Sequence, residues 1–275
     1  MNPAHTQRDF SIRLEWGLSG AAAVAAGADV AVVVDVLSFT TTLSVALDRG
    51  VEVFPYRWND DGAAAYAAER GATLAVGRRA ARPGTVSLSP GTIRAAPSLE
   101  RLVLPSPNGS SIACELGATA TICVAASLRN ASAVARWIGL HHPGAVVAIV
   151  AGGEKWPDGA LRPAVEDLWG AGAVIAELPA PGPLSPEAQV AVDAWTAVQA
   201  RMIDALRDCA SGRELIEAGY ADDVAVAAEL GQSTCVPVLR DQRFVDAATA
   251  RRDPTDPQPP TRIRRDRRNC LHHRR

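Results

Sequence analysis

The chain has 275 residues, of which 48% are hydrophobic and 5% aromatic, and its formal net charge is −2. A chain of this length can bury a full core, and its bias toward alanine, valine and leucine favours helices packed on a sheet over a β-sandwich. The body of the sequence shows no nucleic-acid footprint, and no apolar stretch is long enough to span a bilayer. We therefore expect a cytoplasmic α/β protein with no membrane partner and no specific nucleic-acid partner.

The charge is unevenly distributed along the chain. Residues 251–275 hold nine arginines against three aspartates, which leaves the rest of the chain near −8. The same segment is rich in proline and has no periodic apolar face, so it predicts a disordered tail. The expected organisation is one α/β domain over residues 1–250, followed by this tail.

The positions of the cysteines and histidines argue against several kinds of metal and catalytic site. The five cysteines lie far apart without a Cys-x-x-Cys pair, which indicates free thiols and neither a zinc ribbon nor a disulfide framework. The five histidines lie near the termini or in one polar turn. This placement argues against a histidine nucleophile and against a histidine-rich zinc site.

Strand-like and helical patterns alternate along the chain. Strand-like segments lie at 12–16, 30–36, 51–54, 73–76, 101–104, 121–125, 146–150 and 235–239. Helical patterns lie at 43–47, 63–70, 111–116, 131–139, 165–178 and, after a proline-rich break, 186–209. The alternation predicts a three-layer α/β fold, in which a mainly parallel or mixed β-sheet carries helices on both faces. Because loops after parallel strands gather at one edge, residues far apart in sequence can share a site there.

The first such loop follows the strand predicted at 30–36. Branched residues on both alternating faces indicate a strand buried on both sides. This strand delivers Asp35 to the start of a helix, beside a hydroxyl cluster that includes Thr40. Free backbone N–H groups at a helix start favour anions. The alternative is that Asp35 only caps the helix.

A second loop spans residues 106–111 and contains Asn108, Gly109 and Ser110. Asn-Gly permits left-handed backbone and serine supplies donors, so the loop could cradle a phosphate. An ordinary Asn-Gly turn with a serine cap explains the same residues.

Two further loops carry charge. Glu166 and Asp167 open an otherwise apolar helix, where they form either an oxygen-ligand site for a hard cation or a common compensation of the helix dipole. Arg78 and Arg79, with Ser89 further along, could clamp an anionic substrate, although most paired arginines are simply solvated.

Two phosphatase motifs are incomplete. Cys123 and Arg129 have the Cys-x5-Arg spacing of cysteine phosphatases, but no glycine lies between them to let a loop wrap phosphate. A buried cysteine at the end of a strand is the alternative. Asp35 is placed like the aspartyl nucleophile of haloacid-dehalogenase phosphatases, but Leu37 stands where their second aspartate lies.

Several short pieces lie in register with one known family. They are Asp35-Val36-Leu37 with Thr40-Thr41-Thr42, Gly77 with Arg79, Ser89-Pro90, Asn108-Gly109, Asn130-Ala131-Ser132-Ala133-Val134, Glu166-Asp167 with Ala171-Gly172, and Asp223 with Val236-Pro237. On these pieces the chain resembles the 2-phosphosulfolactate phosphatase family of magnesium-dependent phosphatases, over most of residues 11–245. The resemblance implies an α/β fold, Mg²⁺, and hydrolysis of the phosphate ester of a small 2-hydroxy acid. The products would be sulfolactate and phosphate, in coenzyme M biosynthesis.

The resemblance implies a site centred on Asp35, Asn108, Glu166 and Asp167, with Arg79 nearby. The loops described above extend this set. The expected catalytic and metal-binding residues are Asp35, Glu166 and Asp167. The expected substrate- and phosphate-binding residues are Thr40, Arg79, Ser89, Asn108, Gly109 and Ser110. Attack on phosphorus by water or by a carboxylate stays open, as does a homodimer, and the expected partner is a small anionic phosphate ester.

Four positions depart from the family pattern. Ser38, Arg78, Leu88 and Ser111 stand where the family usually has Arg, Glu, Asn and Arg. The loss of two arginines predicts a preference for a less highly charged phosphate ester. The alternative function is that of a non-catalytic, divergent paralogue that binds a small anion or a partner protein.

Overall fold

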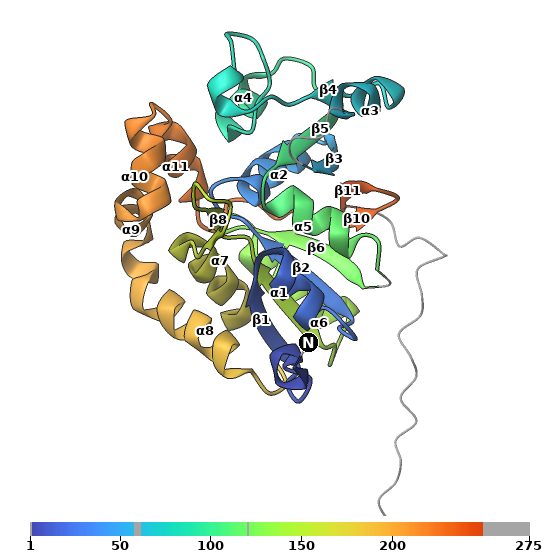
Figure 1. The fold of residues 1–275 in the computed structure, drawn as a ribbon, viewed down its shortest axis with the longest axis vertical. Helices are drawn as coiled ribbons and strands as arrows, with labels where there is room; N and C mark the ends of the chain where they lie inside the picture. The colour runs from blue at the N-terminus through green and yellow to red at the C-terminus, as the bar shows by residue number, and fades with distance from the viewer. Residues whose placement is uncertain (1, 58–61, 120, 250–275) are drawn as a thin grey trace, which may run out of the picture.

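The computed structural model describes residues 2–57, 62–119 and 121–249, and the tail predicted at 251–275 lies outside them (Figure 1). Among these residues, nine strands form one sheet in the order β1-β7-β2-β6-β10-β11-β3-β5-β4. Their bounds are β1 Ile12–Trp16, β2 Val30–Val34, β3 Glu52–Arg57, β4 Thr73–Leu74, β5 Arg101–Ser106, β6 Ile122–Ala126, β7 Val147–Ala151, β10 Pro237–Arg240 and β11 Arg243–Asp246. A separate small hairpin pairs β8 (Glu154–Lys155) with β9 (Leu161–Arg162).

Helices cover both faces of the sheet. They are α1 Gly17–Val24, α2 Phe39–Asp48, α3 Ala63–Glu69, α4 Pro90–Ala95, α5 Gly109–Leu116, α6 Ala131–His141, α7 Val165–Ala176, α8 Pro186–Val198, α9 Met202–Asp208, α10 Ala210–Glu217 and α11 Ala221–Ala227. Alternate residues of β2 enter two cores: Val32 packs with α6 and α7 on one face, and Val33 packs with α1, α2 and α5 on the other. The predicted three-layer α/β fold is therefore confirmed.

The sheet consists of two parallel groups that run in opposite directions. The strands β1, β7, β2 and β6 are mutually parallel, and so are β3, β5 and β4. The antiparallel hairpin β10–β11 joins the groups and pairs antiparallel with β6 on one side and β3 on the other. Twist of roughly 20–25° per strand accumulates to roughly 100° between β2 and β5. This rotation lets the carboxyl ends of oppositely running strands approach each other.

The helix predicted over residues 186–209 is wrong as one element. It breaks into α8 and α9 at a 3-10 turn, Gln199–Arg201. A straight helix of that length would run about 36 Å, whereas Ala191, Leu206 and Val224 all pack into the same core. The chain therefore curves, and α8 to α11 form the orange arc along one side of Figure 1. No helix in the described ranges combines the length and apolarity required to cross a membrane.

Candidate active site

Asp35 lies just beyond the carboxyl end of β2, where the chain turns into α2. Its two carboxylate oxygens accept the backbone N–H groups of Gly109 (2.8 Å) and Phe39 (3.2 Å). Thr40 fixes the same turn, because its hydroxyl donates to the carbonyl of Asp35 (2.7 Å) and accepts its N–H (3.1 Å). Asp35 is thus anchored by backbone groups that follow β2 in one strand group and β5 in the other.

Gly109 opens α5 directly against this carboxylate. A Cβ at Gly109 would lie 2.6 Å from Asp35 Oδ2, so the approach requires a residue without a side chain. The next amide, that of Ser110, donates to the Ser106 hydroxyl (3.0 Å), and the Ser110 hydroxyl donates to the Ser106 carbonyl (2.9 Å). The amide of Gly109 therefore holds Asp35, and the amide of Ser110 stabilises the loop by bonding to Ser106.

Asp167 is held in the same way at the start of α7. Its carboxylate accepts the N–H groups of Val36 (2.7 Å) and Gly153 (2.8 Å), and so ties the segment after β2 to the segment after β7. Glu166 precedes it, and both residues are only 2% exposed. The sequence places both carboxylates in the first turn, where helix-dipole compensation is favourable.

Burial is the main cause of raised pKa values among these acids. Burial raises the pKa of Asp35 and raises that of Asp167 well above its usual value, and nearby carboxylates add to both shifts. The backbone amides oppose the shifts, as does Arg78 at Asp35. Burial, followed by the charges of Asp35 and Glu166, raises the pKa of Glu154 to about 7. The site therefore holds more negative charge than its surroundings solvate.

A cavity of about 190 Å³ opens against this cluster. It is lined by Asp35, Leu37, Ser38, Arg78, Leu88, Ser106, Pro107, Asn108, Glu154, Ser211, Glu214 and Leu215. Asn108 Nδ2 lies 3.4 Å from Glu154 Oε2 across the strand groups. Side chains from both groups and from α10 thus enclose a volume suited to a small polar molecule.

The predicted site residues differ in where they lie relative to the cavity. Asp35 and Asn108 line the cavity directly. Thr40, Gly109 and Ser110 support them through the bonds described above, and Glu166 and Asp167 lie buried beside them. Arg79 is exposed and lies outside the cavity lining, whereas Arg78 lies within it.

Arg78 crosses to the position of Ser38. One terminal nitrogen, Nη2, donates to the Ser38 hydroxyl, while Nε donates to Asp223 Oδ2 (2.7 Å). The hydroxyl of Ser89 donates to the other oxygen of Asp223, so Ser89 acts on the cavity through Asp223 and Arg78. The wall at Ser38 therefore carries a guanidinium, which comes from another loop.

Glu154, Glu214 and Ser211 line the cavity but were not among the predicted site residues, although Glu154 lies in a loop, 151–154, that the sequence placed at the sheet edge. Glu154 carried a usable signal, because it follows the end of β7 in the way that Asp35 follows β2. Glu214 and Ser211 come from α10. No pattern in the sequence indicated that this helix folds back over the sheet edge.

The chemistry of the acids fits a hard divalent cation. Their oxygens are the ligands that Mg²⁺ prefers, and a cation would neutralise carboxylates whose pKa values are raised by burial and, to a lesser extent, by one another's charge. No three acidic, histidine or cysteine side chains of the described residues are grouped to hold an ion by themselves. Mg²⁺ is commonly held by one or two carboxylates together with substrate phosphate, and the cavity offers that arrangement.

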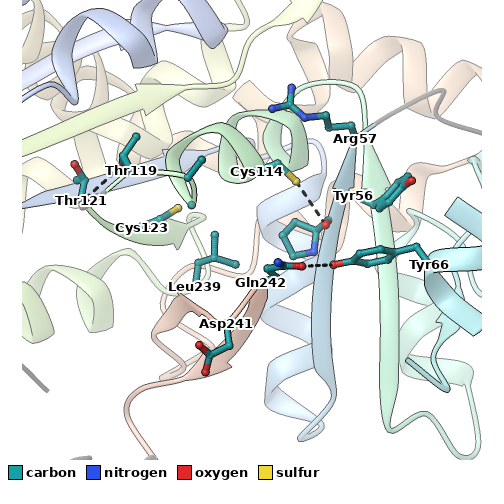
Figure 2. Close-up of a pocket in the computed structure, with 13 residues that line it drawn as sticks. Tyr56, Arg57, Tyr66, Cys114, Thr119, Thr121, Cys123, Leu239, Asp241 and Gln242 are labelled. Atoms are coloured by element: carbon teal, nitrogen blue, oxygen red, sulfur yellow. Dashed lines mark hydrogen bonds between the residues drawn. The ribbon is translucent and has the colours of Figure 1, made fainter. Parts of the chain in front are cut away.

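A larger cavity, of about 440 Å³, has a separate lining (Figure 2). Cys114 and Cys123 line it, whereas Asp35 and Glu154 do not. Cys123 lies in β6, and burial raises the pKa of its thiol to about 12. The guanidinium of Arg129 forms ion pairs with Asp48 and Glu229 (3.1 Å each). These features fit a packed strand cysteine and lack the activated thiolate of a cysteine phosphatase.

Comparison with known proteins gives concordant results. The model of the 2-phosphosulpholactate phosphatase family matches residues 21–242. A protein of Thermus thermophilus named "Probable 2-phosphosulfolactate phosphatase" is 32% identical over 217 residues, covering 77% of this chain and 88% of that protein. A protein of Deinococcus radiodurans with the same name is 32% identical over 228 residues, with the same two coverages. The matched region contains every carboxylate of the cluster.

Proposed function

Since the chain belongs to the 2-phosphosulfolactate phosphatase family, we propose that it hydrolyses the phosphate ester of a small 2-hydroxy acid in a Mg²⁺-dependent reaction. Membership makes it a phosphoric monoester hydrolase. Its substrate would be a phosphosulfolactate-like ester, which would give sulfolactate and phosphate, the reaction associated with coenzyme M biosynthesis. The observation that carries the proposal is the group of buried, mutually repelling carboxylates against a small cavity.

Asp35 and Glu166 would hold the cation. The oxygens of Asp35 and Asp167 all accept backbone N–H groups, but Asp35 lines the cavity and Asp167 does not. The part of Asp167 would therefore be to fix the segments around the site. When bound, Mg²⁺ would polarise the phosphoryl group and offset the charge that develops on it.

The remaining cavity residues would orient the ester and move a proton. Asn108 can donate its amide to an ester or phosphate oxygen. Glu154 lines the same cavity, and without a cation burial and the charges of Asp35 and Glu166 raise its pKa to about 7. Burial, the largest of these causes, acts on Glu154 with or without a bound cation, so its carboxyl would hold a proton more readily than an exposed glutamate. An alkoxide leaving group needs such a proton, which a positioned carboxyl can supply. Glu154 is therefore the proposed donor to the leaving oxygen.

A substrate panel tests the proposal. Phosphate release is measured from phosphosulfolactate, phospholactate and a generic aryl phosphate, with Mg²⁺ and with excess chelator. We expect turnover of the 2-hydroxy-acid esters that stops when the chelator is added. Absence of turnover with every ester would favour the non-catalytic alternative, whereas turnover unaffected by chelator would remove the metal from the proposal.

A further inference from the structure

Arg78 is fixed in the cavity wall by three side chains from two other segments. Nε is paired with Asp223 of α11, Nη2 is bonded to Ser38 before α2, and the Tyr220 hydroxyl donates to the Arg78 carbonyl (2.9 Å). The side chains of Arg78 and Asp223 are 13% and 3% exposed. Such a set of contacts pre-orients a guanidinium, in contrast to a solvated surface arginine.

One edge of this guanidinium remains available. Nη1 makes no hydrogen bond to any residue in the described ranges, whereas Nε is committed to Asp223. Nη2 has a second N–H besides the one that it donates to Ser38, so the Nη1–Nη2 edge can present parallel N–H groups to two oxygens of one anion. Carboxylate and sulfonate groups match this fork, and a lysine ammonium would not reproduce it.

The position of Arg78 distinguishes the acid group of a substrate from its phosphate. The phosphate belongs beside the carboxylates, where a cation would be held. Arg78 enters the cavity from the loop after β4 and bonds to Ser38, three residues beyond Asp35. In a 2-hydroxy-acid phosphate the carboxylate is on the carbon that bears the ester oxygen, so the two anionic groups are close neighbours. A second positive group at the edge of the phosphate position would fit the second anion.

We propose that Arg78, held by Asp223, Ser38 and Tyr220, binds the carboxylate of the 2-hydroxy-acid ester and selects substrates that carry this group. The proposal rests on the proposed function and adds a specificity-determining residue to it. Asp223 is a positioning residue, because it acts on the substrate only through Arg78. The guanidinium of Arg78 also supplies, at Ser38, the positive charge that an arginine usually provides at this position in the family.

A matched substrate pair tests the assignment. Phospholactate and propan-2-yl phosphate have the same ester carbon, but a methyl group replaces the carboxylate in the second compound. For R78Q we expect kcat/KM to fall roughly 10- to 100-fold with phospholactate and to change less than threefold with propan-2-yl phosphate. An equal fall with both esters would overturn the assignment, because Arg78 would then act on the phosphate or on the structure.

Two further variants separate charge from folding. Arg82→Gln removes an exposed arginine from the same loop and should leave both esters unaffected. Ser38→Arg in the R78Q background returns a guanidinium to the neighbouring position and should recover part of the phospholactate activity. Failure of this rescue in a folded double variant would count against a role for charge at this wall.

A binding measurement keeps the inference separable from the phosphatase reaction. Lactate contains the carboxylate without the phosphate, and its effect on Tm is measured at millimolar concentrations for wild type and R78Q. If no ester is hydrolysed but lactate stabilises only the wild type, the acid site stands and the phosphatase function fails. If lactate stabilises both proteins equally, or neither, the assignment of Arg78 is overturned.

Discussion

The carboxylates and the guanidinium of the cavity are held by different means. Asp35 and Asp167 are bonded by backbone amides from the segments after β2, β5 and β7, so the fold itself places them. Arg78 is placed by the side chains of Ser38 and Asp223, which belong to other segments. A group that is bonded by backbone amides stays in place when the surrounding side chains are substituted. A group that is bonded by side chains changes position or is lost when those side chains are substituted. The phosphate end of the cavity should thus be the rigid part, and the acid end the adaptable part.

The largest effect is expected from Asp35→Asn. The asparagine amide keeps the shape of the side chain but removes its charge. Its NH2 group would also lie against a backbone N–H, and two donors cannot bond to each other. Turnover should fall roughly 100-fold or more, since a group that stabilises transition-state charge is lost. The measurement is kcat/KM with saturating Mg²⁺. Asp193→Asn, an exposed aspartate on α8, is the matched control, and activity within tenfold of wild type for Asp35→Asn would contradict a central role.

Asp167→Asn should affect stability as well as activity. Both oxygens of Asp167 accept buried N–H groups, and an asparagine can accept only on its single oxygen. A buried donor left without an acceptor costs about 1–3 kcal/mol. With Mg²⁺ present to offset the repulsion among the carboxylates, the free energy of unfolding should therefore fall by this order. Urea denaturation followed by circular dichroism measures it. An unchanged midpoint would show that these bonds do not tie the strand segments together.

The raised pKa values predict how stability depends on pH. The pKa of Glu154 rises from an ordinary value of 4.5 to about 7 in the folded protein. A raised folded pKa means that stability from this group is complete below 4.5 and is lost as pH rises through 7. Without Mg²⁺, Tm should therefore fall between pH 4.5 and 7, and Asp35 and Asp167 shift in the same direction.

Glu154→Gln provides the control for this profile. Glutamine cannot ionise, so the variant should show a shallower fall of Tm over the same pH range. The scan is performed in chelator, because a bound cation would also stabilise the ionised carboxylates. Identical slopes for the variant and the wild type would show that Glu154 titrates at its ordinary pKa.

The parts of the site that sequence predicted are those set by local order along the chain. Asp35 follows a strand buried on both faces, and Asn108 opens the loop after another strand, so both could be placed at a sheet edge. Their meeting needs the β10–β11 hairpin, which reverses the second strand group. Sequence indicated the first strand of that hairpin but not its partner or its direction.

Arg78 shows why position-by-position comparison falls short. Ser38 reads as a lost arginine when residues are compared one at a time. The structure brings Arg78 to Ser38 from 40 residues further along the chain, and such a contact is set by tertiary packing. Ser111, the other apparent loss, is bonded to the Ser106 carbonyl (3.3 Å) and lies outside the cavity lining. The cavity therefore keeps a positive charge at Ser38, through Arg78, whereas Ser111 does not contribute to its lining.

The smallest effect is expected from Asp223→Asn, which tests the side-chain anchor directly. Asparagine can still accept from Arg78 Nε, so the contact weakens without leaving the guanidinium wholly unpaired. A loss of about 1 kcal/mol in orientation corresponds to roughly fivefold in KM for phospholactate, with kcat less affected. KM for propan-2-yl phosphate should not change, because that ester has no carboxylate for Arg78 to hold. Asp222→Asn, the exposed neighbour on the same helix, is the control. A fall in kcat of the same size with both esters would mean that Asp223 supports the whole cavity, and the contrast between a rigid phosphate end and an adaptable acid end would be lost.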